Sequence, residues 1–181
     1  MTASKSLSLI FIIRFLLLTT FSVPSTHSRS PSQNDVALIR AICKRTPDYY
    51  VCVHSLRSDP TSSHADVRGL AQIMVQVMKG RANDAMQKII QLLQKGTDPK
   101  QKKALSSCAD DYKAILEADV PMAIEALEKG DPKFAEDGAN DAALEANSCE
   151  ENFAGKSPIT PYNEIMHDVA AVAAAIVRNL L

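Results

Sequence analysis

Residues 66–95, DVRGLAQIMVQVMKGRANDAMQKIIQLLQK, decide the fold class. Their apolar side chains recur at spacings of three and four residues, which is the period of an amphipathic α-helix. A helix of this length rises about 45 Å, and no later segment changes to the alternating pattern of a strand. The sequence therefore predicts an all-α fold. The apolar stripe consists of Val67, Ala71, Met74, Met78, Ala82, Ala85, Ile89 and Leu92.

A second helix is marked by signals at both of its ends. Gly96 is a typical C-cap for the preceding helix, and Asp98 with Pro99 supplies a capping side chain and a first-turn proline. The helical pattern continues to Gly130, and Pro121 within it predicts a kink. The apolar positions of this helix are Leu105, Cys108, Tyr112, Ile115, Leu116, Ala123, Ala126 and Leu127.

A third helix begins with the same cap-plus-proline signal at Asp131 and Pro132, and a fourth follows a loop at 155–161. The third helix carries a narrow stripe of small side chains, which permits close approach of a neighbouring helix. Four amphipathic helices joined by short connections predict an up-down-up-down four-helix bundle. The stripes are Ala135, Ala139, Ala142, Ala146, Cys149 and Phe153, and then Tyr162, Ile165, Val169, Val172, Ile176 and Leu180.

The first 28 residues have the pattern of a secretory signal peptide. Lys5 precedes an apolar stretch at 7–23, and small residues at 23–28 offer cleavage sites. Arg14 interrupts the apolar stretch, so the run of about 20 uncharged residues that a membrane-spanning helix needs is missing. We therefore expect residues 29–181 to form the mature domain, which enters the secretory pathway and is not held in a membrane.

All four cysteines follow this segment, and an even number in a secreted chain favours two disulfides. Three pairings are possible. Cys43 and Cys52 are separated by eight residues across a proline-containing turn, which favours pairing them and leaves Cys108 with Cys149. The first bond would join two short helices, at 35–57, into an N-terminal hairpin outside the bundle.

Composition and motifs argue against several functions. The chain has 181 residues, enough for one domain, with 20 basic and 21 acidic side chains and no Lys/Arg cluster, so nucleic-acid binding is not expected. No nucleophile–base pair, phosphate loop or metal-ligand spacing occurs, and we expect no catalysis, metal or cofactor. The acidic residues of the third helix are expected on its solvated face. They are Glu136, Asp137, Asp141, Glu145, Glu150 and Glu151.

The connection at 129–134, KGDPKF, is the one segment that an ordinary bundle does not require. Pro132 would fix the backbone, Phe134 would offer an aromatic face, and Lys133 would be held out as a cation at the tip of the bundle. A rigid loop of this kind can enter a carboxylate-lined pocket. The structural alternative is a first-turn proline, a phenylalanine packed onto the core and a solvated lysine.

Over residues 35–181 the chain resembles the plant invertase and pectin methylesterase inhibitor proteins. Within that family, the segment 130–138, GDPKFAEDG, is similar to the invertase-inhibitor branch, whose Pro-Lys-Phe motif contacts the enzyme active site. The resemblance also rests on the signal peptide, the Cys43/Cys52 hairpin, the segment Cys108-Ala-Asp-Asp-Tyr112, Cys149 and the all-helical remainder.

The resemblance implies a four-helix bundle with an N-terminal hairpin, disulfides Cys43–Cys52 and Cys108–Cys149, and inhibition of acid β-fructofuranosidases of the cell wall or vacuole. Carried over to this chain, Pro132, Lys133 and Phe134 become the residues that bind acid invertase. Two alternatives stay open. The sister branch blocks pectin methylesterase with helix faces of the same scaffold, and a structural or storage protein would have no target enzyme.

Overall fold

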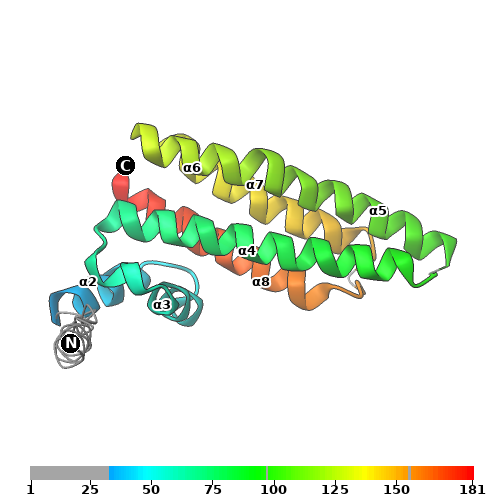
Figure 1. Cartoon of the computed structure of the whole chain (residues 1–181), viewed down its shortest axis with the longest axis horizontal. Coiled ribbons are helices and arrows are strands. Elements are labelled where there is room, and N and C mark those ends of the chain that lie inside the picture. The colour runs from blue at the N-terminus through cyan, green and yellow to red at the C-terminus, as the bar shows by residue number, and fades with distance from the viewer. Residues whose placement is uncertain (1–32, 97, 155) are drawn as a thin grey trace, which may run out of the picture. The chain divides into compact units, whose positions relative to one another are not determined.

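The computed structural model describes residues 33–181 except residues 97 and 155 (Figure 1). The predicted signal peptide, residues 1–28, lies outside the described residues. The described part of the chain consists of helices, turns and short connections without a strand, which confirms the all-α prediction. In the same part, no helix combines the length and the apolar character needed to cross a membrane.

Four helical rods form the predicted up-down-up-down bundle (Figure 1). The rod α4 packs against α8 and α5, and α7 packs against α8, α6 and α5. The second rod is continuous but changes helix type in its middle. The rods are α4 (Val67–Gln94), the joined elements α5 (Pro99–Ala114), η2 (Ile115–Asp119) and α6 (Val120–Lys129), then α7 (Pro132–Glu151) and α8 (Thr160–Val177).

The predicted apolar stripes form the core of the bundle. On α7 the small residues of the stripe are almost completely buried, so neighbouring helices approach its backbone closely. On α8 the apolar run ends where Arg178 begins a short 3-10 segment, η3 (Arg178–Leu180). The buried members of the α4 and α7 stripes are Ala71, Met74, Met78, Ala82, Ala85 and Ile89, and Ala135, Ala139, Ala142, Ala146 and Cys149.

The predicted N-terminal hairpin consists of α2 (Gln33–Cys43) and α3 (Tyr49–Ser58), followed by a 3-10 segment, η1 (Pro60–His64). The disulfide Cys43–Cys52 joins the two helices, with Cα atoms 5.5 Å apart. Asp48 caps α3 by accepting a hydrogen bond of 2.8 Å from the Val51 backbone N–H. At the turn, the Arg45 guanidinium donates to the Asn179 side chain at 3.1 Å, which ties the hairpin to η3.

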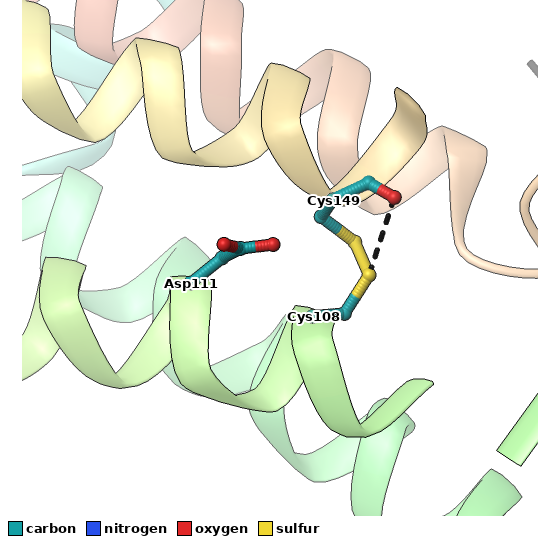
Figure 2. Close-up of side chains that lie close together, drawn as sticks. All are labelled: Cys108, Asp111 and Cys149. Carbon is teal, nitrogen blue, oxygen red and sulfur yellow. Dashed lines mark hydrogen bonds between the residues drawn. A yellow bond between two sulfur atoms is a disulfide. The ribbon is translucent and has the colours of Figure 1, made fainter. Parts of the chain in front are cut away.

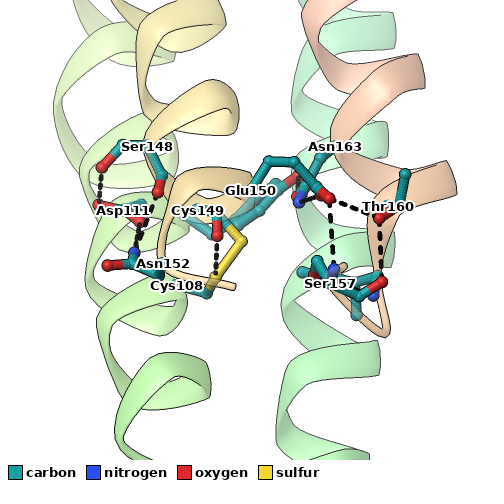
Figure 3. The surroundings of a disulfide bond; sticks show 11 residues. Cys108, Asp111, Ser148, Cys149, Glu150, Asn152, Ser157, Thr160 and Asn163 are labelled. Carbon is teal, nitrogen blue, oxygen red and sulfur yellow. Dashed lines mark hydrogen bonds between the residues drawn. A yellow bond between two sulfur atoms is a disulfide. The ribbon is translucent and has the colours of Figure 1, made fainter. Parts of the chain in front are cut away.

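The second disulfide, Cys108–Cys149, joins α5 to α7 with Cα atoms only 4.6 Å apart, and both predicted pairings are thereby confirmed (Figure 2). Beside it, Glu150 of α7 organises the start of α8 (Figure 3). Its carboxylate accepts hydrogen bonds from the Thr160 hydroxyl at 2.6 Å and from the Asn163 side-chain amide at 2.7 Å. Burial raises the pKa of Glu150, but these hydrogen bonds outweigh it and lower the pKa overall.

A π turn lies directly before Pro121, the residue at which the sequence predicts a kink. The Val120 N–H donates to the Ile115 carbonyl, five residues back, instead of to the usual fourth residue. Pro121 has no N–H to donate and stands in the first turn of α6. The rod therefore accommodates the proline by a local change of helix type, and helix α6 continues beyond it.

One close contact fixes α7 against this π turn. A Cβ atom placed on Gly138 would lie 2.7 Å from the Asp119 carbonyl oxygen and 3.3 Å from the Ala123 backbone nitrogen. Both atoms belong to the backbone, which cannot move without disturbing the helix. Glycine is therefore required at position 138 by the spacing of two helices.

We expect Gly138→Ala to lower the free energy of unfolding by about 1–3 kcal/mol, because the added methyl group overlaps backbone atoms. Gly80 is a matched control within helix α4, since a Cβ atom there meets no other atom within 4 Å. Gly80→Ala should raise stability by about 0.5–1 kcal/mol through helix propensity. Urea unfolding followed by circular dichroism measures both changes, and equal effects of the two substitutions would contradict the packing constraint.

Candidate functional site

The residues predicted to form a loop at the tip of the bundle begin helix α7 instead. Gly130 ends α6 with a left-handed φ of 78°, and the Asp131 N–H donates to the Ala126 carbonyl at 2.8 Å. Helix α7 then begins at Pro132, as the cap-plus-proline signal predicts. The loop prediction is therefore wrong for Pro132, Lys133 and Phe134, because a left-handed glycine and a first-turn proline reverse the chain within two residues.

The prediction that Asp131 caps this helix is also wrong. Its side chain accepts no hydrogen bond from the first turn of α7. The corresponding prediction for Asp98 is confirmed, because its carboxylate accepts from the backbone N–H groups of Lys100 and Gln101. Asp131 lies on the exposed surface beside the first turn of α7.

Phe134 is not packed onto the core, which contradicts the structural alternative for this residue. Phe134 is 56% exposed, although the next residue of the same helical turn, Ala135, is fully buried. Phe134 borders a pocket of about 470 Å³ between the end of α6 and the start of α7. The pocket is lined by Met122, Glu125, Ala126, Lys129, Gly130, Asp131 and Phe134. An aromatic face is thus available for contact with another molecule.

Lys133 is exposed, with 61% of its side chain accessible, but its ammonium group has partners on its own helix. Its Nζ donates to Asp137 Oδ1 at 2.7 Å and lies 3.4 Å from Glu136 Oε2. Pairs of this kind, three and four residues apart on an exposed helix face, are weak because solvent screens the two charges. The Lys133 ammonium group is therefore oriented by Asp137 and Glu136 and can still exchange them for carboxylates of another molecule.

The prediction that Glu136 lies on a solvated face is wrong, because only 8% of the residue is exposed. Its Oε1 accepts a 2.7 Å hydrogen bond from Nε of Arg178, which follows α8. That hydrogen bond, aided by Lys133, lowers the pKa of Glu136. Sequence reasoning missed this pair, since its members lie 42 positions apart and no local pattern joins them.

A second group of acidic side chains lies between the second rod and α7. Burial, and then the nearby charges of Asp141 and Glu145, raise the pKa of Asp119 to about 6. Asp119 is 8% exposed, and none of the described residues forms a hydrogen bond with its Oδ2. Burial and Glu145 raise the pKa of Asp111 to about 6 as well.

Asp111 also lies beside the second disulfide (Figure 2). A carboxylate oxygen of Asp111 and the sulfur atoms of Cys108 and Cys149 lie within 4.8 Å of one another. The two sulfurs are bonded to each other, so neither is the thiolate that a metal ion would require. The Asp111 carboxylate accepts instead from the Ser148 hydroxyl at 3.3 Å and from the Asn152 side-chain amide at 3.4 Å (Figure 3). These contacts give Asp111 a role in packing α5 against α7.

The family model described as plant invertase/pectin methylesterase inhibitor matches residues 37–176. This chain belongs to that family. The family is one of inhibitors of enzymes, invertase and pectin methylesterase, and its members are not themselves enzymes.

Similar proteins include one named as an inhibitor of fructosidase and one named as an inhibitor of pectinesterase. The chain is 46% identical over 140 residues to "Cell wall / vacuolar inhibitor of fructosidase 1" from Arabidopsis thaliana, covering 77% of this chain and 67% of the relative. It is 29% identical over 155 residues to "Pectinesterase inhibitor" from Actinidia deliciosa, covering 85% and 79% respectively.

A solved member of the invertase/pectin methylesterase inhibitor family has the same fold. The crystal structure of a mutant form of a pectin methylesterase inhibitor from Arabidopsis superposes with a TM-score of 0.68. The match covers 77% of this chain and 95% of that chain at 22% identity, so the likeness concerns the fold alone.

We expect Phe134→Ala to change the free energy of unfolding by less than about 1 kcal/mol, because the ring is more than half exposed. Leu127→Ala is the control from the same end of the bundle. Leu127 is 1% exposed, and its truncation should cost about 2–5 kcal/mol. Thermal unfolding of the oxidised protein measures both, and a loss at Phe134 as large as that at Leu127 would mean that the ring packs onto the core.

We expect Asp119→Asn to stabilise the protein at neutral pH and not at pH 4. The folded-state pKa of Asp119, about 6, lies above the ordinary value of 3.8. The free energy of unfolding therefore falls as the pH rises from about 4 to about 6, because ionisation is less favourable in the folded state. The amide removes a cost of about 1–3 kcal/mol at pH 7. Melting temperatures measured from pH 4 to pH 7 test this, with Glu128→Gln on the exposed side of α6 as the control. A gain that does not depend on pH would contradict it.

Proposed function

We propose that this protein inhibits plant acid invertases, the β-fructofuranosidases of the cell wall or vacuole, by inserting the first turn of α7 into their sucrose-binding site. The observation that carries the proposal is the pairing of an exposed cation, Lys133, with an exposed aromatic ring, Phe134, at a rigid helix start. The 46% identity to a protein named as an inhibitor of fructosidase supports the choice of target.

Charge provides the first part of the mechanism. Acid invertases resemble retaining glycosidases, which use one carboxylate as a nucleophile and a second as an acid/base. The Lys133 ammonium group would leave Asp137 and face these carboxylates. Its present ion pair is exposed and weak, whereas a pair inside a desolvated cleft is favourable because the enzyme's charges are already buried there. Sucrose and the inhibitor would then compete for one site.

Rigidity provides the second part. Pro132 starts α7, and the buried Ala135 anchors the same turn to the core, so little conformational freedom is lost on binding. Phe134 and the adjacent pocket of about 470 Å³ offer an apolar surface for the rim of the enzyme's cleft. The exposed ring would gain burial in the complex, where aromatic side chains contribute strongly to affinity.

The proposal includes a route to the target. Residues 1–28 would act as a cleaved signal peptide that directs the chain into the secretory pathway. The mature protein would then reach the cell wall space or the vacuole, where acid invertases work. The relative from Arabidopsis is named a cell wall / vacuolar inhibitor of fructosidase, which supports this destination.

Pectin methylesterase is the alternative target, favoured by the 29% identity to a pectinesterase inhibitor from Actinidia deliciosa. In that case the helix faces of the bundle would make the contact. Pro132 would then act only as a helix-start residue, and substitution of Lys133 would have little effect. The two targets therefore make opposite predictions for the same variant.

We expect Lys133→Ala to weaken inhibition of purified acid invertase by at least about tenfold near pH 5, since the complex loses a desolvated ion pair. The matched control is Lys113→Ala. Lys113 is equally exposed, at 61% of its side chain, and also pairs with an acid four residues ahead, Glu117. Inhibition constants of the oxidised mature protein, residues 29–181, measure the effect, and melting curves verify the fold of each variant.

Pectin methylesterase activity, followed in parallel with the same proteins, separates the alternatives. Loss of invertase activity alone, relieved by Lys133→Ala, would support the proposal. Inhibition of invertase that is unchanged in Lys133→Ala would contradict the role of the α7 turn. Inhibition of pectin methylesterase alone would assign the protein to the sister branch, and inhibition of neither enzyme would argue for a structural or storage role.

A further inference from the structure

Arg178 follows α8, the last long helix that the structure describes, yet it contacts Glu136 near the N-terminal end of α7. It begins η3, and its Nε donates to Glu136 Oε1 at 2.7 Å. The two residues are 42 positions apart in the sequence. This hydrogen bond connects the N-terminal end of α7 to the C-terminal segment.

Glu136 contacts both Arg178 and Lys133. One carboxylate oxygen of Glu136 is occupied by Arg178, and the other, Oε2, lies 3.4 Å from Lys133 Nζ. Only 11% of the Glu136 side chain is exposed, so its carboxylate cannot rotate freely into solvent. Arg178 therefore fixes the position of a negative charge against which the Lys133 ammonium rests.

Lys133 has two acidic neighbours that differ in mobility. Asp137, whose side chain is 41% exposed, is the closer partner at 2.7 Å, but no arginine or lysine other than Lys133 pairs with it among the described residues. Glu136 is the more distant partner and is held in place from behind. When Lys133 exchanges Asp137 for a carboxylate of another molecule, Glu136 is the partner that can keep the lysine stem in the same direction.

We propose that Arg178 and Glu136 are positioning residues for inhibition, which set the direction in which the Lys133 side chain leaves the first turn of α7. This inference rests on the proposed function. A free lysine side chain loses rotamer entropy when it is held in one conformation. A side chain that is oriented before binding loses less of it, and the complex is correspondingly tighter.

The test is a double-mutant cycle on inhibition of acid invertase by the mature protein. Arg178→Ala should weaken inhibition by about threefold to tenfold in the parent background. In the Lys133→Ala background the same substitution should have almost no effect, because no lysine remains to be positioned. Arg178→Lys, which keeps the charge but not the planar guanidinium, should restore part of the loss.

Two further variants separate positioning from folding. Glu136→Gln keeps the shape of the side chain and an oxygen for Arg178, but removes the charge that faces Lys133, and it should weaken inhibition as Arg178→Ala does. Arg81→Ala on α4 removes another partly exposed arginine, which pairs with Asp84, and should leave inhibition unchanged. Melting temperatures show whether any variant has lost its fold, and Glu136→Gln keeps the test usable if Arg178→Ala does not fold.

Several results would overturn the inference while leaving the proposed function intact. Equal effects of Arg178→Ala in the parent and Lys133→Ala backgrounds would mean that Arg178 acts independently of Lys133. Unchanged inhibition by Arg178→Ala would mean that Lys133 needs no such support. Tighter inhibition by Glu136→Gln would mean that Glu136 competes with the enzyme for the lysine. If Lys133→Ala itself has no effect, the proposed function fails, and the positioning role falls with it.

Discussion

Close packing of α7 against the other rods of the bundle is the constraint on which the structure depends. At one end, the Cys108–Cys149 disulfide brings the Cα atoms of α5 and α7 to 4.6 Å. Further along, Gly138 leaves no room for even a methyl group against the Asp119 carbonyl. Small residues between these points keep the interface narrow. The position of the helix start at Pro132 is fixed as a consequence, because the helix behind it cannot shift.

Two carboxylates attach α7 to α8, one near each end of the helix. Glu150 binds the first turn of α8 through Thr160 and Asn163, and Glu136 binds Arg178 beyond its last turn. In both, hydrogen bonds lower the pKa, so the groups stay charged under acidic conditions. Asp119 has the opposite character, as a buried carboxyl without a partner on one oxygen. Ionised Glu136 and Glu150 therefore stabilise the bundle, whereas ionisation of Asp119 destabilises it.

Local patterns in the sequence predicted most of the fold, because helical periodicity and cap residues act over a few positions. The four rods, the hairpin and both cysteine pairings follow from such patterns. The helix end at Gly130 and the helix start at Pro132 also follow from local signals, whereas the loop expected at Pro132, Lys133 and Phe134 does not occur. The burial of Glu136 could not be predicted, because it depends on Arg178 at the far end of another helix. The exposure of Phe134 likewise depends on the direction of α7 relative to α6.

Because of the π turn at Ile115–Asp119, the side chains of α6 are rotated around the helix axis relative to those of α5. A π turn holds one residue more than an α turn, and one residue corresponds to a rotation of about 100° around the helix axis. The apolar stripe of α5 therefore ends at Ile115, and a stripe displaced around the axis begins at Val120. Without the additional residue, α6 would present a different side to α7. The orientation of α6 that places Met122 and Ala126 in one pocket lining with Phe134 thus depends on what amounts to a one-residue insertion.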